Sequence, residues 1–162
     1  MADKEAMRGD ESIPAERILD LIPQKPPFRF IDSIVEIGDE TIRAEYRFSD
    51  DHDFYRGHFP GNPVTPGVIL IEAMAQTGVV ALGIYLLLRG GMPEAGLQQI
   101  TTLFAFADEI EFSGIVYPGQ KIIIHGEKIY LRRGNLRTRC HITRENGETV
   151  CSGVLTGTGV TR

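Results

Sequence analysis

Two ionisable side chains with complementary chemistry, His58 and Glu72, stand close together in this sequence. His58 lies in residues 57–67, where a proline or glycine restricts or relaxes the backbone at every second or third position. Glu72 lies in an apolar segment, residues 68–88, that carries almost no other charge. An imidazole and a carboxylic acid placed where water is scarce suit proton transfer, and they cost stability if nothing uses them. We therefore interpret the pair as a candidate general base and general acid.

Each of these residues also has a purely structural interpretation. A loop histidine often does no more than satisfy a hydrogen bond in a rigid turn. A carboxylate in an apolar helix can pair with a buried backbone or basic group. The apolar neighbours of Glu72 nevertheless predict that burial disfavours its charged form and raises its pKa.

The start of the predicted helix adds a third chemical element. The amides of Gly67 and Val68 fall in its first turn, where unpaired N–H groups can receive a carbonyl oxygen as it gains negative charge. A glycine at this position also lets a ligand approach the backbone closely. Base, acid and oxyanion donors thus occur within fifteen residues.

Composition predicts a soluble protein of one domain. The chain has 162 residues, of which 42% are hydrophobic and 24% charged, so it can build a core without a metal or a disulfide. The net charge of -5 argues against nucleic acid as the main partner. The N-terminal residues are charged and lack the apolar core of a secretory signal. We expect a flexible tail over residues 1–12, a single domain over residues 13–162 and a cytoplasmic location.

Hydrophobic patterning predicts an α+β fold with one long helix. Residues 14–22, preceded by Ser12 as a candidate cap, are typical of a short helix. The long helix is predicted from about Pro66 to Leu88, with Thr65 as its cap and Gly90-Gly91 closing it. The remaining segments have β-type patterns: two strands between residues 28 and 48, then 97–106, 109–112, 120–131, 136–144 and 149–158. A helix that is apolar almost all round, among antiparallel strands, predicts a curved sheet wrapped around it.

The long helix has a membrane alternative, because about 20 apolar residues can span a bilayer. Glu72 and Gln76 lie four residues apart on one face of it, and no basic cluster flanks it before Arg89. Both features argue against a membrane span.

The two cysteines are predicted to be free thiols. Asn146-Gly147 is typical of a type I′ hairpin turn, which pairs Ile142 with Cys151 and Cys140 with Gly153. The two cysteines are then diagonal neighbours, about 7–8 Å apart, which is beyond the usual reach of a disulfide. Free thiols fit a reducing compartment.

The run from residue 57 to residue 76 resembles the β-hydroxyacyl-acyl-carrier-protein dehydratases of bacterial fatty-acid synthesis, which have the hot-dog fold. The matching motifs are Gly-His-Phe-Pro-Gly at residues 57–61, Pro63-Val64, Pro-Gly-Val at residues 66–68, and Glu-Ala-Met-Ala-Gln at residues 72–76. A weaker likeness covers roughly residues 15 to 158.

This resemblance implies a mechanism and an assembly. His58 would remove the proton next to a thioester and Glu72 would protonate the departing hydroxyl, giving a trans-2-enoyl thioester. The acyl chain would lie in an apolar tunnel beside the helix, without a metal or organic cofactor. Family members are homodimers, some of them trimers of dimers, and take the histidine and carboxylate of one site from different subunits. Residues that would surround the substrate are Gly67, Val68, Phe59, Pro66 and Gln76.

The sequence departs from the family pattern in two places. Thr65 stands where a methionine is common, and Ser-Gly-Ile at residues 113–115 replaces the basic residues and proline often found there. The contact with an acyl carrier protein and the shape of the tunnel therefore stay open. An acidic carrier protein requires a basic patch, for which Arg132 and Arg133 are our candidates. Arg137 and Arg139 are explained at least as well by surface solubility.

The other histidines receive structural interpretations. His52 stands among aspartates and is expected to be solvated, while His125 and His141 lie on strands without partners at metal-ligand spacing. Spacing alone leaves open a metal site made of His52, His58 and Glu72, but no further ligand cluster supports it, so we predict none.

Two other functions stay open beside dehydration. One is an acyl thioesterase with the same fold, and the other is a non-catalytic module that binds acyl chains. The second gains nothing from a carboxylic acid buried in its wall. Family members that also isomerise the double bond typically carry aspartate where this chain has Glu72, which favours dehydration alone.

Overall fold

A single curved antiparallel sheet wraps around one long helix in the computed structural model, which describes residues 12–161. The helix runs without a break through α3 (Gly67–Ala75), η1 (Gln76–Ala81) and α4 (Leu82–Arg89). The predicted long helix is therefore confirmed, but its middle turn is a π-helix, which the sequence pattern did not indicate. The expected flexible tail lies outside the described residues, except for Ser12.

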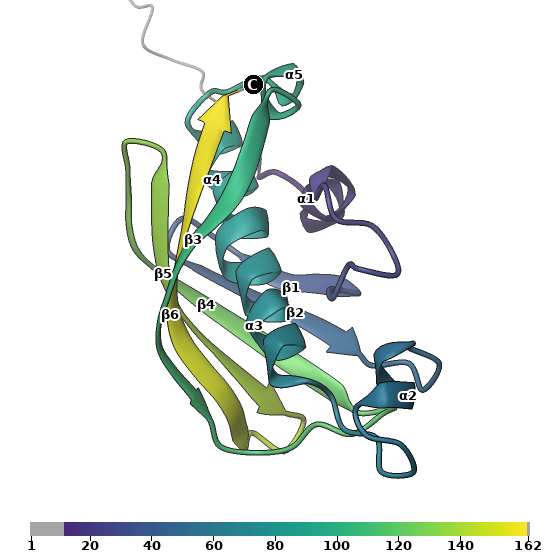
Figure 1. Ribbon diagram of the computed structural model, residues 1–162. Helices are drawn as coiled ribbons and strands as arrows, with labels where there is room; N and C mark the ends of the chain where they lie inside the picture. The colour runs from purple at the N-terminus through teal and green to yellow at the C-terminus, as the bar shows by residue number, and fades with distance from the viewer. Residues whose placement is uncertain (1–11, 162) are drawn as a thin grey trace, which may run out of the picture.

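The sheet has six strands in the order β1-β2-β4-β5-β6-β3, so β1 and β3 form its two edges. The strands are β1 (Ser33–Ile37), β2 (Thr41–Arg47), β3 (Ile100–Phe112), β4 (Lys121–Arg132), β5 (Asn135–Arg144) and β6 (Thr149–Thr161). Short helices precede or connect them: α1 (Ala15–Leu21), α2 (Phe54–Gly57) and α5 (Glu94–Leu97). Figure 1 shows the long helix lying across the concave face of the sheet, with α1 beside α4 and α2 beyond the start of α3.

Glycines let the middle of the helix approach the sheet closely. A Cβ at Gly78 in η1 would overlap Cys140 Sγ on β5, and a Cβ at Gly157 on β6 would overlap Val79 Cγ1. A Cβ at Gly126 on β4 would lie only 3.1 Å from the Cα of Gly78. The central turn of the helix is thus held directly against three neighbouring strands.

Burial follows from this arrangement. Even-numbered positions of β5 from Leu136 to Ile142 are buried and face the helix, as the alternation in the sequence predicts. One core cluster surrounds α3 and η1, and a second packs α4 against α1 and β1, including Ile18 and Ile22. Both cysteines are buried and free, which confirms the prediction made from strand register.

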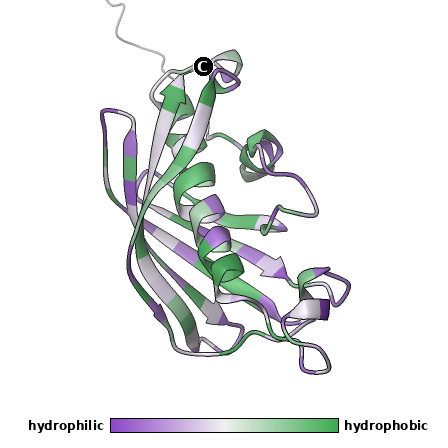
Figure 2. Cartoon of the chain, in the orientation of Figure 1, coloured by the Kyte–Doolittle hydropathy of each residue, from purple (hydrophilic) through white to green (hydrophobic). Residues whose placement is uncertain are grey.

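The 23-residue helix Gly67–Arg89 is long and apolar enough to cross a membrane by composition alone, and 67% of its most apolar window is buried inside the protein. Figure 2 shows the long helix coloured as hydrophobic along much of its length, in the space between the sheet and α1. The apolar residues of this helix therefore form part of the hydrophobic core.

Several local predictions were wrong. The β5–β6 register pairs Ile142 with Cys151 as expected, but it shifts next to the turn. Only Gly147, with φ 86°, has a positive φ there, and Arg144 N donates to Glu148 O, so the loop is a three-residue turn with a bulge and not a type I′ turn. Residue 97, predicted to begin a strand, ends α5.

The two helix caps also differ from prediction. Pro14 precedes α1 and Pro66 precedes α3, each in an extended conformation and without a side-chain cap. The Thr65 hydroxyl is instead hydrogen-bonded to the Tyr55 hydroxyl at 2.6 Å. Thr65, which local spacing predicted as the cap, therefore bonds to Tyr55 in the tertiary structure and not to the start of the helix.

Candidate active site

His58 is positioned by the short helix before it and by the loop after it. It follows α2 directly, and its N–H donates to Phe54 O at 3.0 Å. Its ring Nδ1 lies 2.9 Å from Val64 O. Because a carbonyl oxygen can only accept, Nδ1 must carry a proton in this contact. A neutral His58 therefore keeps Nε2 unprotonated, and Nε2 is the atom available to act as a base.

The loop that follows is closed by main-chain hydrogen bonds. Phe59 and Asn62 exchange N–H···O bonds of 3.2 and 2.9 Å, and Val64 N donates to His58 O at 2.9 Å. Gly61 takes the turn position with φ 73°. The Phe59 ring stacks on the His58 ring with 4.2 Å between centroids and is itself about half exposed. The loop thus holds the imidazole by a hydrogen bond at Nδ1 and by stacking of the Phe59 ring.

Glu72 lies on α3 and is half-buried. Burial raises the pKa of Glu72 above its ordinary value, and a hydrogen bond from Gln76 opposes this shift less strongly. The predicted direction of the shift is confirmed. A carboxylic acid that tends to stay protonated can deliver a proton to a leaving group.

Gln76 joins Glu72 to a distant part of the chain. Its side chain is fully buried. Nε2 donates to Glu72 Oε1 and to Phe28 O, each at 2.8 Å, while Oε1 accepts from Phe30 N at 2.8 Å. Both N–H donors and the carbonyl oxygen of the amide are thus bonded to the Glu72 carboxyl group or to the segment before β1. Gln76 is therefore a positioning residue for Glu72.

The start of α3 is packed against the edge strand β3. A Cβ at Gly67 would lie 2.8 Å from ring carbons of Phe112, so this position needs glycine for packing as well as for any approach by a ligand. Pro66 is buried, whereas Val68 is 70% exposed and presents an apolar side chain to the surface. The amides of Gly67 and Val68 have no acceptor within the helix, because they belong to its first turn.

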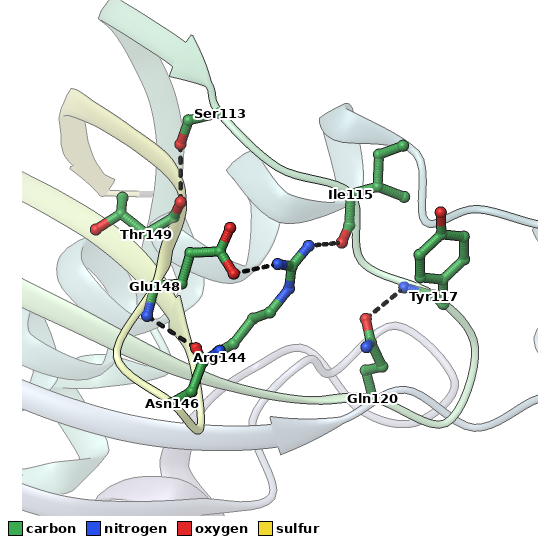
Figure 3. Close-up of polar contacts among 8 residues, drawn as sticks. All are labelled: Ser113, Ile115, Tyr117, Gln120, Arg144, Asn146, Glu148 and Thr149. Atoms are coloured by element: carbon green, nitrogen blue, oxygen red, sulfur yellow. Dashed lines mark hydrogen bonds and ion pairs between the residues drawn. The ribbon is translucent and has the colours of Figure 1, made fainter.

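An arginine that the sequence did not single out holds the segment after β3. The Arg144 guanidinium on β5 donates to Ile115 O and pairs with Glu148 (Figure 3). Val116 O, one residue further, accepts from Thr65 N at 2.8 Å just before α3. Residues 113–115, where the sequence departs from the family pattern, are thus anchored at Ile115 by an arginine 29 residues away in sequence.

The expectation that His52 is solvated was wrong. Its ring is half-buried, stacks on Phe54 at 4.8 Å, and its Nε2 is 2.8 Å from the Tyr46 hydroxyl. Burial is the largest cause that raises the pKa of Tyr46, to about 12, so this hydroxyl keeps its proton. Phe54 begins α2, so the aromatic cluster around His52 holds the helix that leads into His58. Only the aromatic composition of residues 46–55 could have indicated it.

The remaining candidates lie apart from His58. Arg132 and Arg133 are exposed at the β4–β5 turn, and the Arg132 guanidinium lies 4.9 Å from the centre of the Tyr130 ring. Lys121, at the other end of β4, pairs with Arg47 at the end of β2, and α2, which leads into His58, follows β2 on that side of the sheet (Figure 1). The strand between them spans roughly 36 Å. The two arginines are thus far from the His58 loop of the same chain.

His125 and His141 are direct cross-strand partners with parallel rings 4.3 Å apart, a pairing that strand spacing alone did not reveal. Within residues 12–161 no group of three or more histidine, cysteine or acidic side chains is arranged to hold a metal ion. The described residues also include no hydrogen bond or ion pair between His58 and Glu72 of the same chain.

The chain matches one family model and is similar to several curated proteins of one name. Residues 22–153 match the model of the FabA-like domain. The 3-hydroxyacyl-[acyl-carrier-protein] dehydratase FabZ of Caldicellulosiruptor bescii is 36% identical over 142 residues, covering 86% of this chain and 94% of that protein. The protein of the same name from Yersinia enterocolitica is also 36% identical over 142 residues, covering 86% and 79%.

Solved structures support the fold. The dehydratase heterocomplex ApeI:P from Xenorhabdus doucetiae matches with a TM-score of 0.73 at 12% identity, covering 93% of this chain and 94% of that one. The thioesterase HI1161 from Haemophilus influenzae matches with a TM-score of 0.64 at 16% identity, covering 93% of each chain. Dehydratases and thioesterases share this architecture, so the structural likeness defines the hot-dog fold and not the reaction.

Proposed function

Because this chain belongs to the FabA-like domain family, we propose that it is a hydro-lyase that removes water from a β-hydroxyacyl thioester carried by an acyl carrier protein. The observation that carries the proposal is the pair of proton-transfer groups: His58, whose Nδ1–H···O=C bond leaves Nε2 free, and Glu72, whose pKa is raised by burial. A cytoplasmic enzyme made of one domain, residues 13–162, accords with this function.

In the proposed reaction, His58 Nε2 takes the proton from the carbon next to the thioester carbonyl. The thioester oxygen gains negative charge and is received by the amides of Gly67 and Val68 at the start of α3. Glu72 gives its proton to the β-hydroxyl, the C–O bond breaks, and water and a trans-2-enoyl thioester result. Phe59, Pro66 and Gln76 shape the surroundings, and the residues of this site require no metal or organic cofactor.

The edge strand β3 supports a homodimer. It has a sheet neighbour on one side only, and its apolar side chains Leu103, Phe104 and Phe106 are 45–62% exposed. An unpaired edge with exposed apolar residues favours pairing with a second copy. In the proposed dimer, His58 of one subunit and Glu72 of the other form one site. A trimer of dimers and a carrier-protein contact at Arg132 and Arg133 belong to the same proposal.

Turnover of β-hydroxyacyl thioesters tests the function. Formation of the conjugated enoyl product is followed by ultraviolet absorbance, in parallel with release of free thiol. We expect enoyl product without thiol release, and a loss of about 10²–10⁴ in kcat for His58→Ala and for Glu72→Gln. His125→Ala and Glu127→Gln, on β4, are the matched controls and should keep full activity.

Other outcomes identify the alternatives. Thiol release with an acid product would identify a thioesterase. Acyl ligands that raise the melting temperature without any turnover would identify a binding module. Mixing inactive His58→Ala with inactive Glu72→Gln protein should restore about a quarter of the activity if the sites are shared between subunits. Absence of any recovery after subunit exchange would contradict the shared site.

A further inference from the structure

Two buried hydroxyl groups join the short helix before His58 to the chain just before α3. Tyr55 lies in α2 and Thr65 directly precedes Pro66, and the two residues are 5% and 6% exposed. The Tyr55 hydroxyl and Thr65 Oγ1 are 2.6 Å apart, so one hydroxyl donates to the other. Because both groups are shielded from water, their bond is stronger than the same bond would be at the surface.

This bond closes the loop that carries the candidate base. His58 lies between the two residues, three positions after Tyr55. Its ring Nδ1 is bonded to Val64 O at 2.9 Å, and its carbonyl oxygen accepts from Val64 N at 2.9 Å. The imidazole is therefore fastened to the residue directly before Thr65, and a shift of Thr65 is passed on to the ring.

Thr65 also holds the candidate oxyanion donors. Gly67 and Val68 follow it by two and three residues, and Pro66, whose φ is fixed by its ring, is the residue between Thr65 and Gly67. Thr65 N donates to Val116 O at 2.8 Å, which ties the main chain at this point to the segment after β3. Thr65 thus lies at the junction between the base and the oxyanion donors of one chain.

Tyr55 is itself held by its neighbours. Its N–H donates to His52 O at 3.1 Å, and its ring packs edge-on against Phe54 with 4.7 Å between centroids. Burial is the largest cause that raises the pKa of Tyr55, so this hydroxyl keeps its proton at neutral pH. The Tyr55 hydroxyl is therefore a fixed point against which Thr65 is placed.

Packing alone does not explain the threonine hydroxyl. Both residues to which Thr65 is bonded, Tyr55 and Val116, belong to the apolar core cluster around α3. A hydroxyl buried in such surroundings costs free energy unless it is hydrogen-bonded, and a valine would fill the same volume without that cost. The hydroxyl therefore contributes a directed bond that an apolar side chain could not make.

We propose that Tyr55 and Thr65 form a positioning pair, whose hydroxyl bond sets the separation between the base and the oxyanion-binding amides at the start of α3. The inference rests on the proposed dehydratase function and deepens it. In that reaction the proton next to the carbonyl leaves only as the thioester oxygen gains negative charge, so both groups must act on one substrate together. A misplacement of about 1 Å can cost about 10² in rate.

Two variants that each lose one hydroxyl test the pair. Thr65→Val and Tyr55→Phe keep the shape of the core, and each should lower kcat about 10- to 100-fold while KM changes less than about twofold. The double variant should be about as active as the weaker single variant, because both changes remove the same bond. Thr65→Ser keeps the hydroxyl and should retain most of kcat. Losses that multiply in the double variant, or an unchanged kcat in both single variants, would overturn the proposal.

A stability control separates positioning from folding. Ile18→Val on α1 shortens a fully buried side chain in the other core cluster, so it should lower Tm and leave kcat unchanged. If Ile18→Val lowers kcat as much as Thr65→Val does at a similar loss of Tm, the effect is general destabilisation and the proposal fails.

Hydrogen exchange tests the geometry without the reaction. The Val64 amide is bonded to His58 O, so its exchange with solvent deuterium measures how firmly the loop is held. Exchange should be at least about tenfold faster in Thr65→Val and in Tyr55→Phe than in the wild type. Unchanged exchange in both variants would refute the positioning role. If wild-type protein forms no enoyl product, the proposed function fails; if it does and both variants keep its kcat, only the positioning inference fails.

Discussion

Replacing Gln76 by methionine separates the positioning of Glu72 from its burial. Methionine has the same unbranched length, so it fills the space and removes the amide alone. The change breaks three hydrogen bonds of 2.8 Å: to Glu72 Oε1, to Phe28 O and from Phe30 N. The position is fully buried, so water cannot take the place of the lost amide.

The expected loss of stability follows from the groups left behind. The buried N–H of Phe30 loses its acceptor, which costs about 1–3 kcal/mol, and loss of the Phe28 bond adds about 1 kcal/mol. The free energy of unfolding should fall by about 2–4 kcal/mol, equivalent to a drop of about 4–16 °C in Tm for a chain of this size. Thermal unfolding at neutral pH measures it.

The same change should move the pH dependence of activity. Burial raises the pKa of Glu72 and the Gln76 hydrogen bond lowers it. Removing the bond leaves burial alone, so the pKa rises further. Glu72 must be protonated to act as an acid, so the alkaline limb of the kcat/KM profile should move to higher pH.

A neighbouring variant provides the control. Thr77 is fully buried, and its hydroxyl has no hydrogen-bond partner among residues 12–161. Thr77→Val should therefore leave the pH profile in place and keep or raise Tm. If Gln76→Met stays folded and its alkaline limb is unchanged or moves to lower pH, the reasoning about Gln76 and Glu72 is refuted.

Three further predictions concern stability. Folding raises the pKa of Glu72, so ionisation of this carboxyl group destabilises the folded protein as pH rises above the ordinary pKa of 4.5. Glu72→Gln should therefore have a higher Tm than the wild type at pH 8 but not at acid pH. A difference in Tm that is the same at both pH values would contradict this prediction. Gly78→Ala should lower the free energy of unfolding by about 1–3 kcal/mol, because the new Cβ would overlap Cys140. Gly83→Ala has room for its Cβ and should raise the free energy of unfolding by up to about 1 kcal/mol. Urea unfolding of the two variants should therefore show changes of opposite sign. Burial is the main cause that lowers the pKa of both His125 and His141, so their contribution to stability is lost as pH falls below 6.5, and replacing both by phenylalanine should flatten Tm against pH in that range.

Much of the fold was predictable because its signals are local. Period-two alternation located the β5 face from Leu136 to Ile142, and a long apolar run located the helix. The π-helical turn at Gln76–Ala81 was not predictable from this run, because an apolar run of residues does not distinguish an α-helical turn from a π-helical one. Nor were the caps, since Tyr55 competes for the Thr65 hydroxyl only after folding.

The chemistry of the site divides in the same way. Residue types and short spacing by themselves determined the candidate base, the candidate acid and the direction of the Glu72 pKa shift, because the apolar residues 68–71 and 73–75 already desolvate a carboxyl group between them on a helix. Tertiary structure alone decided which ring nitrogen of His58 is free, that Gln76 ties Glu72 to Phe30 across 46 residues, and that Arg17 meets Glu94 across 77. Contacts between segments so distant in sequence arise only when the whole sheet closes around the helix, and no local pattern encodes them.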